Sequence, residues 1–249
     1  MTLETVHPLP LDLREWALFI DIDGTLIDLA PTPSAIIIPK ELPHQLAVVQ
    51  RRAGGAMALV TGRAISAVDE MFHPNRLPVA GMHGAEMRDG AGTVTYKSVE
   101  PADLDPARLE LDLLAKRWPG VILEDKGRAL AIHYRQAPEA EPTIHNALGG
   151  ILKGLGDSWK CQEGKMVVEV HPAAANKGDA VSTFMQSPPY LGRKPFVIGD
   201  DLTDETMFRI ANDAGGRSVG VGNPPFDSIA QYRIGSADEV RDWIGRLAA

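Results

Sequence analysis

Short, uninterrupted runs of hydrophobic residues recur along the first and last thirds of the chain. Runs of this length predict strands that are buried on both faces, as in parallel sheets. The predicted strands cover 16–20, 56–60, 195–199 and 218–221, with a shorter apolar segment at 78–80. Helical spacing of apolar residues predicts helices over 43–52, 64–71, 177–184, 204–212 and 237–247, and the Pro-rich stretch 30–43 predicts a loop. This alternation indicates an α/β fold with a doubly wound, mostly parallel sheet.

The middle of the chain has a different pattern, in which strands come in pairs around turns. We predict a hairpin at 89–96, strands at 121–124 and 128–135, and a second hairpin of 159–162 with 166–170. The predicted helices cover 104–117, with Leu109, Leu113 and Leu114 on one apolar face, and 138–155, with a break at Gly149-Gly150. Paired strands of this kind indicate an α+β insert. The sequence therefore predicts a core domain of 1–97 and 172–249 and an inserted domain of 98–171.

The composition is that of a globular protein with enough apolar residues for a core. The 249 residues are 44% hydrophobic and 23% charged, and the formal charge is −8. An acidic chain is a poor partner for nucleic acid or an anionic membrane, because phosphate backbones need clustered cations. The single cysteine, Cys161, excludes an intramolecular disulfide and a cysteine-rich zinc site. No apolar run approaches the ~20 residues of a membrane span. Residues 1–13 lack a secretory signal, so we expect the cytoplasm, and a monomer or weak dimer.

Asp21 and Asp23 follow the first predicted strand directly. With one residue between them on an extended chain, their side chains point the same way. Two close carboxylates repel, so they need a cation or a shared proton. An isolated Asp-x-Asp is most often a polar turn, but this pair follows a buried strand and precedes Gly24-Thr25. That context favours an active-site role.

Other polar residues follow two more predicted strands or begin a helix: Thr61-Gly62-Arg63, Lys177, and Asp200 with Asp201 and Asp204. Active sites of open α/β sheets lie beyond the carboxyl ends of the strands, where these groups would meet. Asp200 suits an oxygen ligand for Mg²⁺. Asp201 and Asp204 either bind the metal too or support the site from behind it, Asp204 also as a helix cap. Thr61 suits an anion site or a simple cap, and Lys177 a phosphoryl contact or a surface position.

Taken in order, these motifs resemble those of the haloacid dehalogenase (HAD) superfamily of phosphohydrolases. The insert resembles the α/β cap called type IIB, and within that group the chain resembles the trehalose-6-phosphate phosphatases. The resemblance covers roughly residues 16–210. It is carried by Asp21-Ile-Asp-Gly-Thr-Leu26, Thr61-Gly-Arg63, Gly81-Met-His-Gly-Ala-Glu86, Glu124-Asp-Lys-Gly127, His133-Tyr-Arg135, Glu163-Gly-Lys165, Val168-Glu-Val170, Asn176-Lys-Gly178 and Gly199-Asp-Asp-Leu-Thr-Asp-Glu205.

The resemblance implies hydrolysis of trehalose 6-phosphate through an aspartyl-phosphate intermediate. It implies that Asp21 is the nucleophile and Asp23 the general acid and base. The implied cofactor is Mg²⁺, held by the Asp21 carboxylate, the backbone carbonyl of Asp23 and Asp200. Thr61 and Lys177 would hold the phosphoryl group.

In the cap, Glu124, Lys126 and Glu169 fall where the family contacts the disaccharide. Lys165 is a further substrate-binding candidate from the same set of motifs. Carboxylates and an ammonium suit a ligand made mostly of hydroxyls. From the residue types alone, a solvated hairpin turn is the simpler interpretation of these residues.

Arg63 and His83 are candidate substrate contacts in the core, with a structural role as the alternative for His83. Two positions depart from the family pattern. His171 lies where many relatives carry Arg or Lys, so a ligand contact there would become pH-dependent. Met82 lies where many relatives carry Gly, an exchange that we expect to be without consequence.

Three alternative functions stay open. A related enzyme could act on sucrose phosphate or mannosyl-3-phosphoglycerate. A phosphosugar mutase would use the same aspartyl chemistry and return the phosphoryl group to the sugar. A non-catalytic binding domain is a third possibility, against which the intact set of Asp21, Asp23, Lys177 and Asp200 argues.

Overall fold

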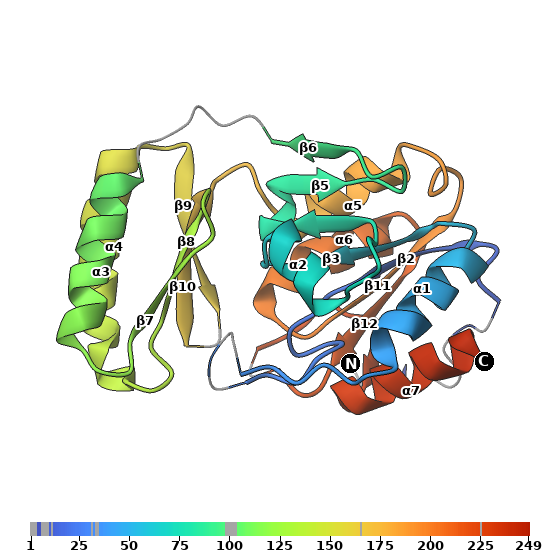
Figure 1. Ribbon diagram of the computed structural model, residues 1–249. Helices are drawn as coiled ribbons and strands as arrows, with labels where there is room; N and C mark the ends of the chain where they lie inside the picture. The colour runs from blue at the N-terminus through green and yellow to red at the C-terminus, as the bar shows by residue number, and fades with distance from the viewer. Residues whose placement is uncertain are drawn as a thin grey trace. The chain divides into compact units, whose positions relative to one another are not determined.

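The computed structural model describes residues 4–5, 10, 12–30, 32, 35–97, 104–164, 166–224 and 226–249 (Figure 1). The chain divides into two compact units. The first comprises 1–30, 36–96 and 176–249, and the second comprises 31–35 and 97–175. Each unit has its own sheet and its own hydrophobic core.

The first unit is built on a nine-stranded sheet in the order β1-β13-β12-β11-β2-β3-β4-β5-β6. Neighbouring strands pair in parallel from β1 to β4 along this order, whereas β5 pairs antiparallel with β4, and β6 antiparallel with β5. The strands are β1 (Glu4–Thr5), β2 (Trp16–Ile20), β3 (Met57–Val60), β4 (Val79–Gly81), β5 (Glu86–Arg88), β6 (Val94–Tyr96), β11 (Lys194–Gly199), β12 (Arg217–Val221) and β13 (Tyr232–Ile234).

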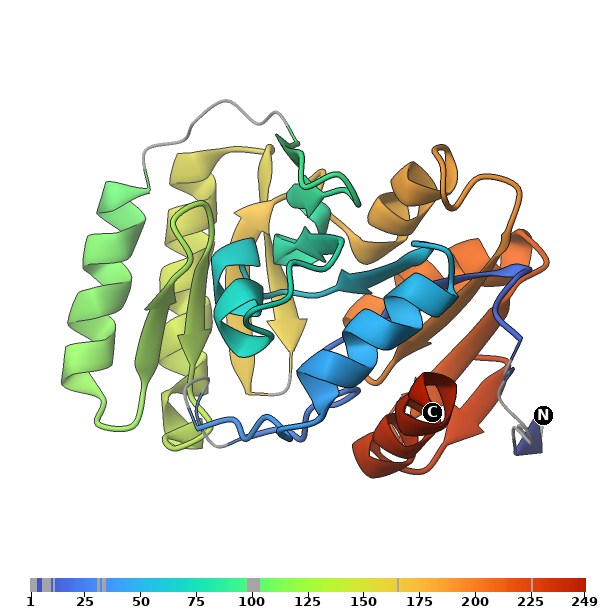
Figure 2. The ribbon, with the colours of Figure 1, turned by 45° about the vertical axis from the view of Figure 1, so that its right-hand side comes forward.

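Helices cover both faces of this sheet, which confirms the doubly wound α/β prediction. Its helices are α1 (Leu42–Arg52), α2 (Ile65–Met71), α5 (Lys177–Met185), α6 (Glu205–Asp213) and α7 (Ala237–Ala248). Alternate residues of the strands face opposite layers: Leu18 and Ile20 pack with α1, α2 and α7, whereas Ala17 and Phe19 pack with α5 and α6. Within the first layer, α1 and α7 lie side by side (Figures 1 and 2).

The order of the strands brings three chain segments to one edge of the sheet. Strand β2 lies between β11 and β3, with Ile20 opposite Ile198 on one side and Leu59 on the other. The segments that begin at Asp21, Thr61 and Asp200 therefore leave the sheet at the same edge. Strands β1 and β13, which lie at the end of the strand order farthest from β6, were not predicted.

The second unit is a four-stranded antiparallel sheet in the order β7-β8-β10-β9, with two helices on one face (Figure 1). The strands are β7 (Ile122–Asp125), β8 (Leu130–His133), β9 (Trp159–Gly164) and β10 (Val167–Pro172), and the helices are α3 (Asp105–Arg117) and α4 (Glu141–Leu155). This arrangement is α+β, as predicted.

Two details of these helices were predicted wrongly. Helix α3 buries Ala107, Leu111 and Leu114, whereas Leu109 and Leu113 are exposed, because leucines lie on both sides of the helix and only one side meets the sheet. Helix α4 continues through Gly149-Gly150 without a break. The burial of Ile144, Leu148 and Ile151 on the face that meets the sheet supports the helix where the glycines do not.

Among the described residues, every helix is too short or too polar to cross a membrane.

Candidate active site

Asp21 is the first residue after β2 and lies at the carboxyl edge of the sheet. Its backbone N–H donates to the Ile198 carbonyl of the neighbouring strand at 3.0 Å. The side chain is only 4% exposed. Ile22, which follows, is fully buried in the hydrophobic core, so the chain anchors Asp21 from both sides.

The Asp21 carboxylate pairs with Lys177, the first residue of α5. Lys177 Nζ donates to Asp21 Oδ1 at 2.7 Å and to Asp204 Oδ1 at 2.6 Å. All three side chains are at most 5% exposed. Among the described residues, Lys177 holds Asp21 Oδ1 and no hydrogen bond holds Asp21 Oδ2.

Burial and charge act in opposite directions on these groups. Burial raises the pKa of Asp21 well above its ordinary value, and the charges of Asp204 and Asp200 add to this, against the opposing effect of Lys177. Burial alone would lower the pKa of Lys177, but the charges and hydrogen bonds of Asp204 and Asp21 outweigh it and raise that pKa. Lys177 is therefore a fixed positive charge at neutral pH.

Asp204 is a fully buried support of the site. Its Oδ2 accepts hydrogen bonds from the backbone N–H groups of Asp200, at 2.9 Å, and Asp201, at 3.0 Å. Its Oδ1 is bound to Lys177, and its side chain makes no cap bond to α6. Asp201 and Asp204 form a reciprocal capping box at the short helix 202–204, in which the Asp201 side chain also accepts from the Leu202 N–H. Of the two alternatives for Asp204, the contacts favour support over direct metal binding.

Three buried carboxylates in this region could hold a metal ion. Asp21, Asp200 and Asp204 each offer an oxygen within 4.8 Å of the others. Gly24 allows the β2 loop to approach them, since a Cβ there would lie 2.2 Å from Asp200 Oδ2, and its φ is +86°. Hard oxygen donors of this kind suit Mg²⁺.

Asp23 faces a cation of its own. Arg63 donates from Nε and Nη2 to the two Asp23 oxygens, at 2.7 and 2.6 Å. The Asp23 side chain is 33% exposed, whereas that of Asp21 is buried. The two carboxylates of the Asp-x-Asp pair are thus compensated separately, Asp21 by Lys177 and Asp23 by Arg63.

Thr61 is buried at the end of β3 and does not cap α2. Its Oγ1 accepts from the Arg63 N–H at 3.1 Å, which closes a tight turn over 61–63. Helix α2 begins four residues later at Ile65, whose N–H donates to Glu86 Oε1. Glu86 therefore does the capping and holds this loop from the neighbouring strand β5.

In the second unit, three predicted substrate contacts come together on the face of the sheet opposite α3 and α4. Glu124 and Glu169 lie on either side of Ala131 in the strand register. Lys126 Nζ donates to Glu169 Oε2 at 2.6 Å, with both side chains less than a tenth exposed.

His133 joins this group through a 2.8 Å contact between its Nε2 and Glu124 Oε2. Burial alone would raise the pKa of Glu124, but its bond to His133 and the charge of Lys126 lower it overall. From the sequence His133 has no predicted role, although strand alternation predicts that its side chain lies on the face opposite the buried side chains of Leu130 and Ile132.

The remaining predicted residues stand as follows. Lys165 lies outside the described residues. His171 is buried at the end of β10, on the same side of the strand as Glu169. His83 is buried beside the Thr61–Arg63 loop.

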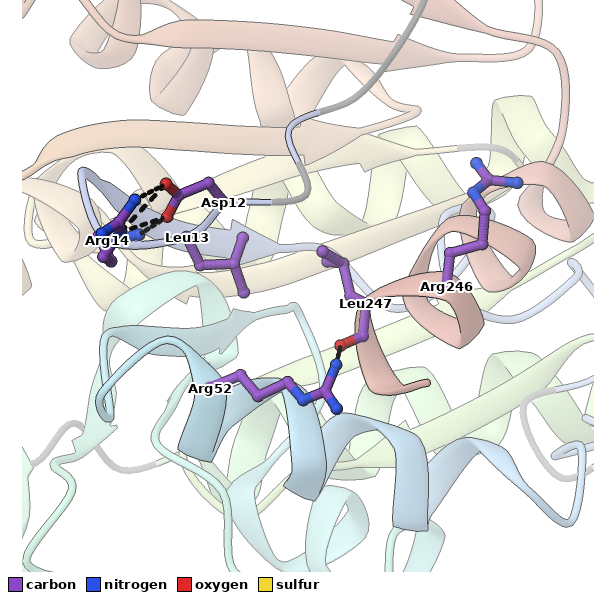
Figure 3. Close-up of a pocket in the computed structure, with 6 residues that line it drawn as sticks. All are labelled: Asp12, Leu13, Arg14, Arg52, Arg246 and Leu247. Atoms are coloured by element: carbon purple, nitrogen blue, oxygen red, sulfur yellow. Dashed lines mark hydrogen bonds and ion pairs between the residues drawn. The ribbon is translucent and has the colours of Figure 1, made fainter.

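A pocket of about 410 Å³ lies elsewhere in the first unit, between the chain before β2 and helices α1 and α7 (Figure 3). It is lined by Asp12, Leu13, Arg14, Arg52, Arg246 and Leu247. Its arginines do not converge on a ligand position: Arg14 pairs with Asp12, Arg52 donates to the Leu247 carbonyl, and Arg246 points away from both (Figure 3). The pocket contains none of the predicted site residues.

Comparison with known sequences identifies relatives over nearly the whole chain. The family model described as trehalose-phosphatase matches residues 19–231. A Sinorhizobium fredii protein named "Probable trehalose-phosphate phosphatase" is 48% identical over 240 residues, which cover 96% of this chain and 90% of the relative. The trehalose-6-phosphate phosphatase of Escherichia coli is 36% identical over 233 residues, which cover 92% of this chain and 85% of that protein.

Solved structures share the fold. The C-terminal domain of the trehalose-6-phosphate phosphatase of C. albicans aligns with a TM-score of 0.80 at 21% identity, over 94% of this chain and 92% of that one. A haloacid dehalogenase-like hydrolase from Bacteroides thetaiotaomicron aligns with a TM-score of 0.64 at 17% identity, over 94% and 99%. At these identities the likeness concerns the fold alone, and it agrees with the HAD-like architecture predicted from the motifs.

Proposed function

The chain belongs to the trehalose-phosphatase family, and from that premise we propose that it hydrolyses trehalose 6-phosphate to trehalose and phosphate. The observation that carries the proposal within the chain is the buried Lys177, which pairs with Asp21 Oδ1 and is backed by Asp204. This arrangement leaves one oxygen of a fixed carboxylate for nucleophilic attack, beside a permanent cation for the phosphoryl oxygens.

In the first step Asp21 Oδ2 attacks phosphorus in line with the bond to the sugar oxygen. That bond breaks, and Asp23, which enters this step protonated and released from its pair with Arg63, donates a proton to the departing sugar oxygen, so that trehalose and an aspartyl phosphate form. Thr61 and Lys177 bind the phosphoryl oxygens during the transfer.

In the second step Asp23, now a carboxylate, takes a proton from water as that water attacks the phosphorus of the aspartyl phosphate. The bond between phosphorus and Asp21 breaks, which releases phosphate and restores both carboxyl groups to their starting states. One residue thus serves as acid and then as base.

Mg²⁺ is the proposed cofactor, and the donor set fits it because buried carboxylate oxygens gather here around a single ammonium. The Asp21 carboxylate, the Asp23 backbone carbonyl and Asp200 would hold it, with Asp201 and Asp204 behind them. A bound dication reduces the repulsion between a carboxylate and a phosphate dianion.

We propose that the second unit acts as the cap and binds the sugar. Glu124, Lys126 and Glu169 supply acceptors and a donor suited to glucose hydroxyls, with Lys165 as a further candidate. Arg63 belongs to the Thr61–Arg63 loop of the first unit and His83 lies beside that loop, and both stay candidate substrate contacts. The cytoplasmic location and the monomeric or weakly dimeric state stay predictions.

The test is release of inorganic phosphate from trehalose 6-phosphate, measured beside sucrose 6-phosphate, mannosyl-3-phosphoglycerate and glucose 6-phosphate. We expect preference for trehalose 6-phosphate, loss of activity in excess chelator, and recovery with Mg²⁺ but little with Ca²⁺, whose coordination is longer and looser. An Asp21→Asn sample prepared in parallel controls for contaminating phosphatases. Preference for another sugar phosphate would refute the substrate, and full activity in chelator would refute the metal.

A further inference from the structure

The segment Met82–Gly84, called here the 82–84 turn, lies beside the Thr61–Arg63 loop. Strands β3 and β4 pair in parallel, with Val60 opposite Ala80, so the segments that follow them run together. Two backbone hydrogen bonds of 2.9 Å join them, from Met82 N to the Arg63 carbonyl and from His83 N to the Thr61 carbonyl.

The backbone of this turn is strained. Met82 has φ 48° and His83 has φ 55°, although neither is glycine. A left-handed conformation is unfavourable for an L-residue, so two such residues in succession are costly. Burial of the Met82 side chain, which is 1% exposed, offsets part of this cost, since it removes apolar surface from water. Strain of this kind persists where the surroundings impose it, and it is concentrated at functional sites.

The His83 ring packs directly against Gly62. A Cβ on Gly62 would lie 2.8 Å from His83 Nε2 and 3.0 Å from its Cε1, so the ring or the loop would have to shift to make room for it. The middle residue of the Thr61–Arg63 loop is therefore pressed against a ring that is itself 8% exposed.

The other side of the turn meets the beginning of α5. A Cβ on Gly84, whose φ is +94°, would lie 2.9 Å from the Ala180 Cβ and 3.2 Å from the Asn176 carbonyl. Asn176 caps α5 by accepting from the Asp179 N–H, and Lys177 is the next residue. The 82–84 turn thus fills the space between the loop of Thr61 and the helix end that carries Lys177.

We propose that the 82–84 turn sets the separation between Thr61 and Lys177, and that His83 is the positioning residue of the phosphoryl-binding site. This inference rests on the proposed function for the roles of Thr61 and Lys177. It explains why the chain maintains two strained residues here: the turn must be tight enough to touch both partners at once.

The experiment compares His83→Asn, Gly62→Ala and the double variant. Asn removes the ring but tolerates the left-handed backbone. For His83→Asn we expect KM for p-nitrophenyl phosphate and for trehalose 6-phosphate, and the inhibition constant of inorganic phosphate, to rise together by about tenfold, because misplacement on the ångström scale has effects of this order or larger. His44→Asn, the same exchange on the exposed side of α1, should leave all three unchanged.

Gly62→Ala places a Cβ against the ring and should raise the same constants. In the double variant the ring is gone, so the loss in kcat/KM should be smaller than the product of the two single losses. Multiplicative losses, or a His83→Asn enzyme with unchanged KM and phosphate inhibition and only a lower melting temperature, would overturn the proposal. If His83→Asn does not fold, Gly62→Ala alone decides by the same constants. If trehalose 6-phosphate is not a substrate, p-nitrophenyl phosphate and phosphate inhibition still test the turn.

Discussion

Replacement of Asp204 by Asn probes the buried support of the active site with almost no change in shape. The Asp204 carboxylate accepts from Lys177 Nζ through Oδ1 and from the Asp200 and Asp201 N–H groups through Oδ2. An amide has only one acceptor oxygen. Its NH2 group must therefore face either the Lys177 ammonium or the two backbone donors, and neither arrangement satisfies all three donors.

The cost follows from these contacts. A hydrogen bond to a charged group is worth about 1.5–3 kcal/mol, and a buried donor left unsatisfied costs about 1–3 kcal/mol. Because Asp204 is fully buried, water cannot replace the lost acceptor, and we expect the free energy of unfolding to fall by about 3–5 kcal/mol. For a domain of this size that corresponds to a melting temperature lower by roughly 6–20 °C. Turnover should fall as well, since Lys177 and the Asp200 backbone lose their anchor.

Urea unfolding and calorimetry, both in excess chelator so that metal binding does not contribute, measure the effect. Asp201→Asn is the matched control in the same loop. Its side chain accepts from the Leu202 N–H at an exposed position, and Asn is as good a helix N-cap as Asp, so its stability should change by less than about 1 kcal/mol. An Asp204→Asn protein as stable as the Asp201→Asn protein would refute this account of the site.

Three more predictions concern chemistry, recognition and the single thiol. Asp21→Asn should lose several orders of magnitude in turnover, as expected of a covalent nucleophile. In chelator it should unfold no more easily than the wild type, because the exchange removes a carboxyl group whose pKa is raised by burial. Appreciable activity in a sample that mass spectrometry shows not to have reverted to Asp would refute the assignment. Replacement of Glu124, Lys126 or Glu169 by Ala should lower kcat/KM for trehalose 6-phosphate roughly tenfold to a hundredfold and leave the hydrolysis of p-nitrophenyl phosphate nearly unaffected. The control is Glu163→Ala, since the Glu163 side chain is 73% exposed. Equal losses on both substrates would mean that the three residues support folding instead. Burial, and then the charge of Glu163, raises the pKa of the Cys161 thiol to about 11, so at pH 8 only about one thiol in a thousand is ionised and iodoacetamide should label the native protein far more slowly than the urea-unfolded chain.

The sequence alone predicts the edge of the sheet at which the site lies, but not the pairing within it. Apolar runs locate β2, β3 and β11, and in a parallel sheet the residues after those runs must meet. The pairing of cations with carboxylates depends on the order of the strands and on the direction in which α5 starts. The local pattern of hydrophobic residues predicts neither of these. The Arg63–Asp23 pair and the burial of Lys177 therefore came only from the structure.

The errors in the fold have similar physical causes. Helix α3 carries leucines all around, so periodicity could not decide which face meets the sheet, and Leu109 and Leu113 were placed wrongly. Strand β13 is three residues long with an arginine at its centre, too short for a hydrophobic run to mark it. Met82, where many relatives carry Gly, is expected from residue type to be without consequence. In the structure, however, the Met82 backbone has a left-handed conformation. Backbone conformation of this kind is imposed by the surrounding packing and leaves no periodic signal.

The balance of charge at the carboxyl edge of β2 links these observations to the choice of cofactor. Asp23 and Arg63 neutralise each other, so their pair leaves the balance unchanged. Asp21 and Asp204 pair with the Lys177 ammonium, and Asp200 lies beside them. When ionised, the three carboxylates exceed that single positive charge by two. Burial raises the pKa of Asp21 in such surroundings, which opposes the ionised form that a nucleophile needs. A dication held by Asp21 and Asp200 would balance the excess and favour the ionised form of Asp21. The same dication would reduce the repulsion between these carboxylates and an approaching phosphate dianion. Lys177 alone cannot do this, because its single positive charge is already paired with two carboxylates.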